Sequence, residues 1–364
     1  MKKKFALLLA AAMTLSALAG CGPKPGSSSS AAPSGSDTST PGSSAVTSTP
    51  AGREDTSSDT SVPAVDAVEV MVLSGPTGVG AAQLITTHTL NSSPDVAYNF
   101  TVATENPEVV NALINGDADI AAVATNVASN LVNKTDGGIQ VLAINTLGVL
   151  YILEKGDTVH AMSDLRGKTL YAPSTAKGSN PEFILNYLLE ENDVDPDQVN
   201  IEWLTPQEIT AKMASSDSGV CMLPVPAATA LLLKDSGVRE AISLSAEWDK
   251  LENGALAQGC IVARTDFIED NPDVIASFLT DYEASVAFMN DEANRQQAAD
   301  MVATLGITAN AAIAAKAIPQ CNLTYIAGNE MKDILESFYQ IMYQADPASI
   351  GGAMPYDSFY YGAE

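Results

Sequence analysis

The sequence VEVMVLSGPTGVG at residues 68–80 decides the fold class of this chain. Residues 68–73 are mostly apolar and rich in valine, which predicts a buried strand. Residues 74–80 are rich in glycine and predict a loop, and the small-residue amphipathic stretch 81–90 predicts a helix. A strand, a glycine-rich loop and a helix in this order are typical of α/β proteins.

The same order recurs along the chain. Further strands are predicted at residues 98–102, 120–123, 139–144, 149–153, 169–172, 200–204, 219–223 and 256–262, with helices between most of them. This alternation predicts mostly parallel sheets with helices on both faces. About 300 residues are too many for one hydrophobic core, so we expect two lobes. We assign residues 65–150 with 252–364 to lobe I and residues 151–251 to lobe II, and expect the strand at 256–262 to return to lobe I.

The first 64 residues differ in composition from the folded part. Residues 1–20 combine three lysines with a short apolar run that ends in small residues, which predicts a secretory signal peptide. Residues 21–64 are rich in Ser, Thr, Pro and Gly and poor in large apolar residues, which predicts a disordered linker.

The end of the signal carries a short motif. The sequence LAGC at residues 18–21 resembles the lipobox of bacterial lipoproteins, in which the cysteine is lipidated and becomes the first mature residue. An ordinary signal peptide with a cysteine at this place is the alternative. The resemblance implies that Cys21 carries a lipid anchor and that the protein is extracytoplasmic, tethered to the bacterial cell membrane.

The composition argues against several classes of function. A formal net charge of −26 without a basic patch argues against binding to nucleic acid or to anionic lipid. His88 and His160 lie far apart without Cys, Asp or Glu at ligand spacing, so no metal site is expected. No Ser–His–Asp, Cys–His or paired-carboxylate set is recognisable, so we expect neither catalytic residues nor a cofactor.

Three cysteines remain when Cys21 is set aside: Cys221, Cys260 and Cys321. An odd number excludes a closed disulfide framework but permits one pair and a thiol. If a disulfide forms, we expect it between Cys260 and Cys321. Three buried thiols are the alternative, and the sequence leaves both open.

The candidate ligand-binding residues follow predicted strands. In open α/β sheets, ligands bind beyond the carboxyl ends of strands, where loops lead into helix N-termini. The residues expected at such positions are Ser74, Thr77, Gly78, Thr125, Asn126, Ser174, Thr175 and Lys177. The hydroxyls can donate to a ligand, glycine permits close backbone approach, and Lys177 can neutralise an anion. Helix capping and tight turns are the structural alternatives for these positions.

Three short motifs, in chain order, resemble one known family. They are NGDADIA at residues 115–121, DLRGKT at 164–169 and DFIEDNP at 266–272. Together, after a lipobox, they resemble the solute-binding lipoproteins of ABC importers, in the group that binds nitrate, sulfonates, taurine and thiamine precursors. The resemblance covers most of residues 68–290 and implies a two-lobed type II periplasmic-binding-protein-like α/β fold.

The resemblance also implies a function. A monomeric receptor would capture a small polar solute, anionic and sulfonate-like, between its lobes and present it to an ABC permease and ATPase, without chemistry. A pyrimidine solute of the thiamine-precursor kind is the alternative ligand. An enzyme on the same two-lobed fold and a surface adhesion protein are the alternative functions.

Overall fold

The computed structural model describes residues 67–90 and 96–364. The predicted signal peptide, the predicted linker and the lipidation site Cys21 therefore lie outside the described residues. In the part of the chain that is described, no helix has the length and apolar character needed to cross a bilayer.

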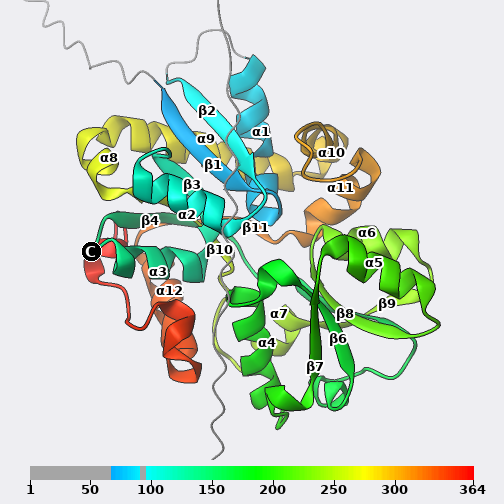
Figure 1. The fold of residues 1–364 in the computed structure, drawn as a ribbon. Coiled ribbons are helices and arrows are strands. Elements are labelled where there is room, and N and C mark those ends of the chain that lie inside the picture. Colours follow the sequence, from blue (N-terminus) through cyan, green and yellow to red (C-terminus); the bar gives the residue numbers. More distant parts are fainter. Residues whose placement is uncertain (1–66, 91–95) are drawn as a thin grey trace, which may run out of the picture. The chain divides into compact units, whose positions relative to one another are not determined.

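Two sheets organise the chain, as Figure 1 shows. The first has six strands in the order β11 (Leu323–Ile326), β4 (Ile139–Thr146), β10 (Gly259–Arg264), β3 (Ile120–Ala124), β1 (Val68–Leu73) and β2 (Tyr98–Ala103). The second has five strands in the order β7 (Asn200–Leu204), β6 (Thr169–Pro173), β8 (Gly219–Pro224), β5 (Leu150–Lys155) and β9 (Val238–Ser243). The predicted two-lobed α/β fold is confirmed, and β10 returns to the first sheet as expected.

Each sheet contains strands of both directions, so the sheets are mixed rather than mostly parallel. β1 pairs in parallel with β2 and β3, and β6 pairs in parallel with β7 and β8. β10 and β5 instead run antiparallel to both of their neighbours. They are the strands that the chain enters after crossing between the sheets. The crossing delivers the chain to the carboxyl ends of the neighbouring strands, so a strand that starts there must run in the opposite direction.

Helices cover both faces of each sheet. One face of the first sheet packs against α1 (Pro76–Leu90), α8 (Thr265–Asp270), α9 (Pro272–Asn290), α10 (Arg295–Thr304) and α11 (Ala311–Ala317). The other face packs against α2 (Asn106–Asn115), α3 (Thr125–Lys134) and α12 (Gly328–Ala345). In the second sheet, one face packs against α4 (Asn180–Glu190) and α7 (Leu244–Asp249), and the other against α5 (Pro206–Ser215) and α6 (Ala227–Lys234).

One hydrophobic cluster includes one face of each sheet. The face of the first sheet under α3 and α12 and the face of the second sheet under α4 and α7 belong to a single cluster of buried residues. Trp248 of α7 is fully buried there, and its ring centroid lies 5.8 Å from that of Phe338 in α12 and 5.3 Å from that of Tyr187 in α4. Aromatic pairs at such separations add to the stabilisation from burial. These contacts connect the two lobes on this side of the molecule.

Helix α1 begins at Pro76, five residues earlier than predicted. Proline suits the first turn of a helix because its N–H would have no intrahelical partner there. The glycines serve close packing. A Cβ atom on Gly78 would lie 2.5 Å from the carbonyl oxygen of Leu73, and one on Gly80 would lie 3.0 Å from the Tyr282 hydroxyl. The stretch predicted as a glycine-rich loop is therefore mostly the first turn of a helix packed closely on its neighbours.

The expected disulfide between Cys260 and Cys321 is wrong. Cys221, Cys260 and Cys321 are all free and buried. Cys260 packs in the cluster under α3 and α12, whereas Cys321 packs in the cluster under α1 and α9 on the opposite face of the sheet. Burial raises the pKa of the Cys221 and Cys321 thiols to about 12, so both are protonated at neutral pH. The alternative of three buried thiols is the observed arrangement.

Candidate ligand-binding site

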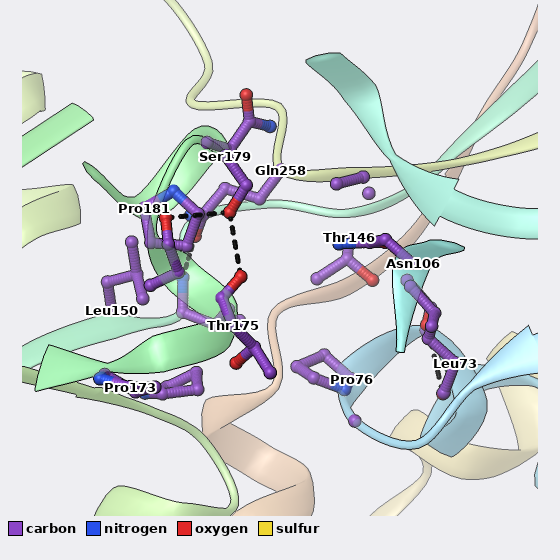
Figure 2. Close-up of a pocket in the computed structure, with 18 of the residues that line it drawn as sticks. Leu73, Pro76, Asn106, Thr146, Leu150, Pro173, Thr175, Ser179, Pro181 and Gln258 are labelled. Carbon is purple, nitrogen blue, oxygen red and sulfur yellow. Dashed lines mark hydrogen bonds between the residues drawn. The ribbon is translucent and has the colours of Figure 1, made fainter. Parts of the chain in front are cut away.

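A cavity of about 210 Å³ lies between the two sheets. Its wall includes the last residues of β1, β3, β4 and β6, and the end of β8. Residues from the carboxyl ends of strands in both sheets therefore converge on one space, as expected for this fold class. Figure 2 shows Leu73 and Pro76 of the first lobe opposite Pro173, Thr175 and Pro181 of the second.

The chain passes this cavity each time it crosses between the sheets. The first crossing runs from Thr146 to Leu150, and both of these residues line the cavity. The second crossing ends at Gln258 and Gly259, which also line it. The antiparallel direction of β5 and β10 is the cause, because it places the first residues of these strands beside the last residues of their neighbours.

Gly259 is needed where β10 starts. A Cβ atom there would lie 2.7 Å from Asn145 Oδ1, 2.8 Å from Thr77 Cγ2 and 3.1 Å from Thr146 Cβ. Only a residue without a side chain fits between these groups, so the backbone of β10 itself forms part of the cavity wall.

Three helix N-termini meet at the cavity. Pro76, Asn106 and Asn180 are the first residues of α1, α2 and α4, and all three line it. The first N–H groups of a helix have no intrahelical acceptor, and the helix dipole makes this end partly positive. Among the described residues that line the cavity, none is Lys, Arg or His, and Glu105 is the one charged side chain. Among the described lining residues, the backbone N–H groups of these helix starts are therefore the groups that can stabilise negative charge.

The N-terminus of α3 does not line the cavity, because other parts of the chain pack over it. Thr125 is fully buried, and its hydroxyl donates to the carbonyl oxygen of Ala257 over 2.8 Å and accepts from Asn180 Nδ2 over 2.7 Å. The Tyr339 hydroxyl donates to the Thr125 carbonyl oxygen over 2.8 Å. Thr125 therefore links α3, α4, α12 and the second crossing behind the cavity wall.

The structure brings together three of the eight predicted ligand-binding residues: Ser74, Thr77 and Thr175 line the cavity. Ser174 lines the wider groove of about 660 Å³ that also contains Ser74, Gly75 and Thr175. Gly78, Thr125 and Asn126 are buried outside the cavity wall, and Lys177 is exposed and lines neither space. Ligand contact by any of the eight stays a prediction.

Three buried polar atoms of lining residues have no partner. Asn106 Oδ1, Thr146 Oγ1 and Asn180 Oδ1 make no hydrogen bond within the described part of the chain. Leaving a buried polar group unpaired costs about 1–3 kcal/mol. A bound molecule that pairs with these atoms would remove that cost, so they are candidate anchor points for a ligand.

The side chains of the cavity wall are mostly of three chemical kinds. Hydroxyl, amide and apolar side chains form its wall, and Glu105 has no second carboxylate or imidazole beside it among the described lining residues. Nucleophilic and general acid–base catalysis need such a pair. Elsewhere in the described ranges, no group of three or more His, Cys, Asp or Glu side chains is arranged to hold a metal ion.

Gln258, Thr146 and Asn180 are among the lining residues that the sequence did not assign to the site. Gln258 precedes a strand, whereas the sequence argument searched only the segments that follow strands. The prediction that residues 256–262 return to the first lobe could have identified this part of the site. A returning strand must start at the space between the lobes, so the residues just before it belong to the wall.

Two α/β lobes with a cavity between them define a periplasmic-binding-protein-like fold, and solved structures agree. An ABC transporter protein from Parabacteroides distasonis is 23% identical with a TM-score of 0.67, over 81% of this chain and 98% of that one. The periplasmic aliphatic sulphonate binding protein SsuA from Escherichia coli is 16% identical with a TM-score of 0.62, over 76% and 86%. The alkanesulfonate-binding protein SsuA from Xanthomonas axonopodis pv. citri, bound to MOPS, is 12% identical with a TM-score of 0.60, over 78% and 93%. At these identities the similarity establishes the fold.

The sequence itself identifies the family. Residues 95–296 match the NMT1/THI5 like family, and the chain belongs to it. No curated protein matches the sequence.

Proposed function

We propose that the protein is an extracytoplasmic solute-binding protein of an ABC importer, which captures a small polar organic solute between its lobes. The observation that carries the proposal is the cavity at the carboxyl ends of strands from both sheets, with helix N-termini and three unpartnered buried polar atoms in its wall. A solute held there contacts both lobes at once. Its capture therefore favours the closed arrangement, which a permease and an ATPase would receive.

Two solute classes fit this wall. A sulfonate-like anion is supported by the three helix N-termini, which stabilise negative charge, and by the sulfonate binding of the similar protein from Escherichia coli. A pyrimidine solute of the thiamine-precursor kind is supported by the resemblance of the sequence motifs to a group that includes such binders. Its ring would lie against the apolar part of the wall, at Leu73, Leu150 and Met222.

The remaining assignments come from the sequence. We propose that Cys21 is the lipid-anchored first mature residue, and that residues 65–150 with 252–364 and residues 151–251 are the two lobes that close on the solute. We assign no catalytic residue, because the described wall of the cavity lacks a nucleophile paired with a base. A monomer suffices, since one chain supplies both sides of the cavity.

A thermal-shift screen of the purified chain from residue 22 onward tests this proposal. The probes are alkanesulfonates, taurine, nitrate, amino acids and aminopyrimidines. A solute at 100 times its dissociation constant stabilises the folded state by about 2.7 kcal/mol, which raises the Tm by roughly 5–10 °C in a chain of this size. Chromatography of the same mixtures checks that the solute is unchanged. Product formation would contradict the proposal, as would a screen without any stabilising solute.

A further inference from the structure

We propose that the solute must carry a hydrogen-bond donor for Asn180 Oδ1, so that a bare alkanesulfonate is excluded, and that Gln258 Nε2 donates to an acceptor on the same solute. This requirement rests on the proposed function, because it names the class of solute that the cavity selects. Asn180 and Gln258 both line the cavity, one from the second lobe and one from the crossing into the first. Figure 2 shows Gln258 beside the start of α4.

The orientation of the Asn180 amide is fixed by the bonds of Thr125. The Thr125 hydroxyl has one proton, which it donates to the Ala257 carbonyl oxygen over 2.8 Å. Its oxygen can then only accept from Asn180, so the NH₂ group of Asn180 must face Thr125, at 2.7 Å. The other end of the amide is therefore the oxygen, which is buried and unpartnered within the described residues. Asn180 offers the solute an acceptor and not a donor.

The orientation of the Gln258 amide is fixed by the backbone. The Val149 N–H, which can only donate, lies 2.6 Å from the Gln258 side-chain oxygen. The Val149 N–H therefore occupies the oxygen end of the amide. The nitrogen, Gln258 Nε2, is the end that can bond to a solute. Gln258 offers the solute a donor and not an acceptor.

These two fixed amides set a rule for the solute. A sulfonate group at neutral pH has only acceptor oxygens, which suit Gln258 and the helix N-termini but leave Asn180 Oδ1 unpaired. Thr146 and Asn106 do not change the rule, because the Thr146 hydroxyl donates or accepts by rotation and the Asn106 amide carries both a donor and an acceptor. An amino or hydroxyl group on the solute satisfies Asn180. A sulfonate that also bears an amine and an aminopyrimidine both obey the rule, so it holds for either solute class proposed above.

The test compares solutes that differ only in the donor, by calorimetric titration of the purified chain from residue 22 onward. One pair is 2-hydroxyethanesulfonate and propane-1-sulfonate, in which a methyl group replaces the hydroxyl group at constant charge. The other is 4-amino-2,5-dimethylpyrimidine and 2,4,5-trimethylpyrimidine, in which a methyl group replaces the amino group and no donor remains. A site left with an unpaired buried acceptor loses about 5- to 150-fold in affinity. We expect the donor-bearing member of the bound pair to bind at least about fivefold more tightly.

Variants then assign the preference to one side chain. Asn180→Ala should reduce the preference within the pair to less than about threefold. Asn192→Ala is the matched control, because this amide lies just beyond the other end of α4 and donates to the Leu188 carbonyl oxygen away from the cavity. It should leave the preference unchanged. The comparison of solutes on the unmodified protein needs no variant, so it stands even if Asn180→Ala does not fold.

The outcomes separate the two proposals. Equal affinity for the two members of a pair overturns the donor requirement and leaves solute capture intact. Tighter binding of the donor-bearing member that persists in Asn180→Ala overturns the role of Asn180. Failure of all four solutes and of the wider screen overturns the proposed function, and the donor requirement falls with it.

Discussion

The first residues of α3 and α4 are similar in sequence, but only those of α4 line the cavity. Each helix begins with polar residues shortly after a strand whose carboxyl end lies at the cavity, Thr125 and Asn126 in one case, Ser179 and Asn180 in the other. Ser179 and Asn180 line the cavity, whereas Thr125 and Asn126 are buried outside its wall. A polar helix start at the right edge of a sheet is therefore a candidate site only when nothing else in the fold covers it.

The cover over α3 comes from distant parts of the chain. The Ala257 carbonyl oxygen, which accepts from Thr125, lies 132 residues away in sequence, and the Tyr339 hydroxyl lies 214 residues away. The sequence near residue 125 therefore does not predict these hydrogen-bond partners. The polar groups of Thr125 are thus engaged within the protein, while Asn180 has one polar atom left over.

The largest effect is expected from Thr125→Val, which breaks the link between the two helix starts. Valine has a similar shape but leaves the Ala257 carbonyl oxygen and Asn180 Nδ2 without the partner they have now. Two buried unpaired groups cost about 2–4 kcal/mol together. Urea unfolding followed by fluorescence should show this loss in the free energy of unfolding.

Thr210→Val is the matched control for that variant. Thr210 is half-buried on α5 and donates to a carbonyl oxygen of its own helix over 2.9 Å. Its replacement should change the free energy of unfolding by less than about 0.5 kcal/mol. A similar loss of stability in both variants would contradict this prediction. It would mean that the hydrogen bonds of Thr125 to Ala257 and Asn180 stabilise the fold no more than the bond of Thr210 within its own helix.

A smaller loss of stability is expected from Gly259→Ala, because the segment that covers α3 also forms the cavity wall. The added methyl group would meet Asn145, Thr77 and Thr146 at 2.7 to 3.1 Å. Overpacking of this kind costs about 1–3 kcal/mol, and the displaced wall should weaken solute binding by about tenfold or more. Thermal unfolding and titration with the solute from the screen measure the two effects.

Gly237→Ala serves as the control for that change. The nearest atoms to a Cβ on Gly237 are Asp235 Oδ1 and Lys155 Cε, at 3.2 and 3.5 Å, so the added methyl group is much less crowded than at Gly259. Stability and affinity should both stay close to those of the unmodified protein. Unaltered binding in Gly259→Ala would show that the wall at β10 does not touch the solute.

The local signals in the sequence were enough to predict the fold class. The apolar strands 68–73 and 200–204 were predicted at the bounds that β1 and β7 have. Two edge strands were missed for a physical reason. β9 carries Arg239 and Glu240, and β11 has four residues, so neither shows the apolar run of a central strand. The mixed direction of the sheets also escaped prediction, because it follows from how the chain crosses between them.

The site was predicted in part for the same reason. Ser74, Thr77 and Thr175 follow strands and line the cavity, so an argument from strand ends finds them. Gln258 lies before a strand, and its role depends on the direction in which β10 runs. Tertiary pairing decided this direction, and no residue near position 258 encodes it.

The smallest effect is expected from Lys177→Ala, and its contrast with Thr175→Ala tests where the site lies. The two residues belong to one turn, but Thr175 lines the cavity and Lys177 does not. Loss of a hydroxyl that bonds the solute costs about 0.5–1.5 kcal/mol, which weakens binding roughly 2- to 12-fold. An exposed ammonium outside the cavity is screened by salt within about 8 Å, so its loss should change the affinity less than twofold at 0.15 M salt. Titration of both variants with the same solute measures the difference. If Lys177→Ala weakened binding more than Thr175→Ala, the solute would be held by a charge at the surface of this turn, and the cavity wall would not be its binding site.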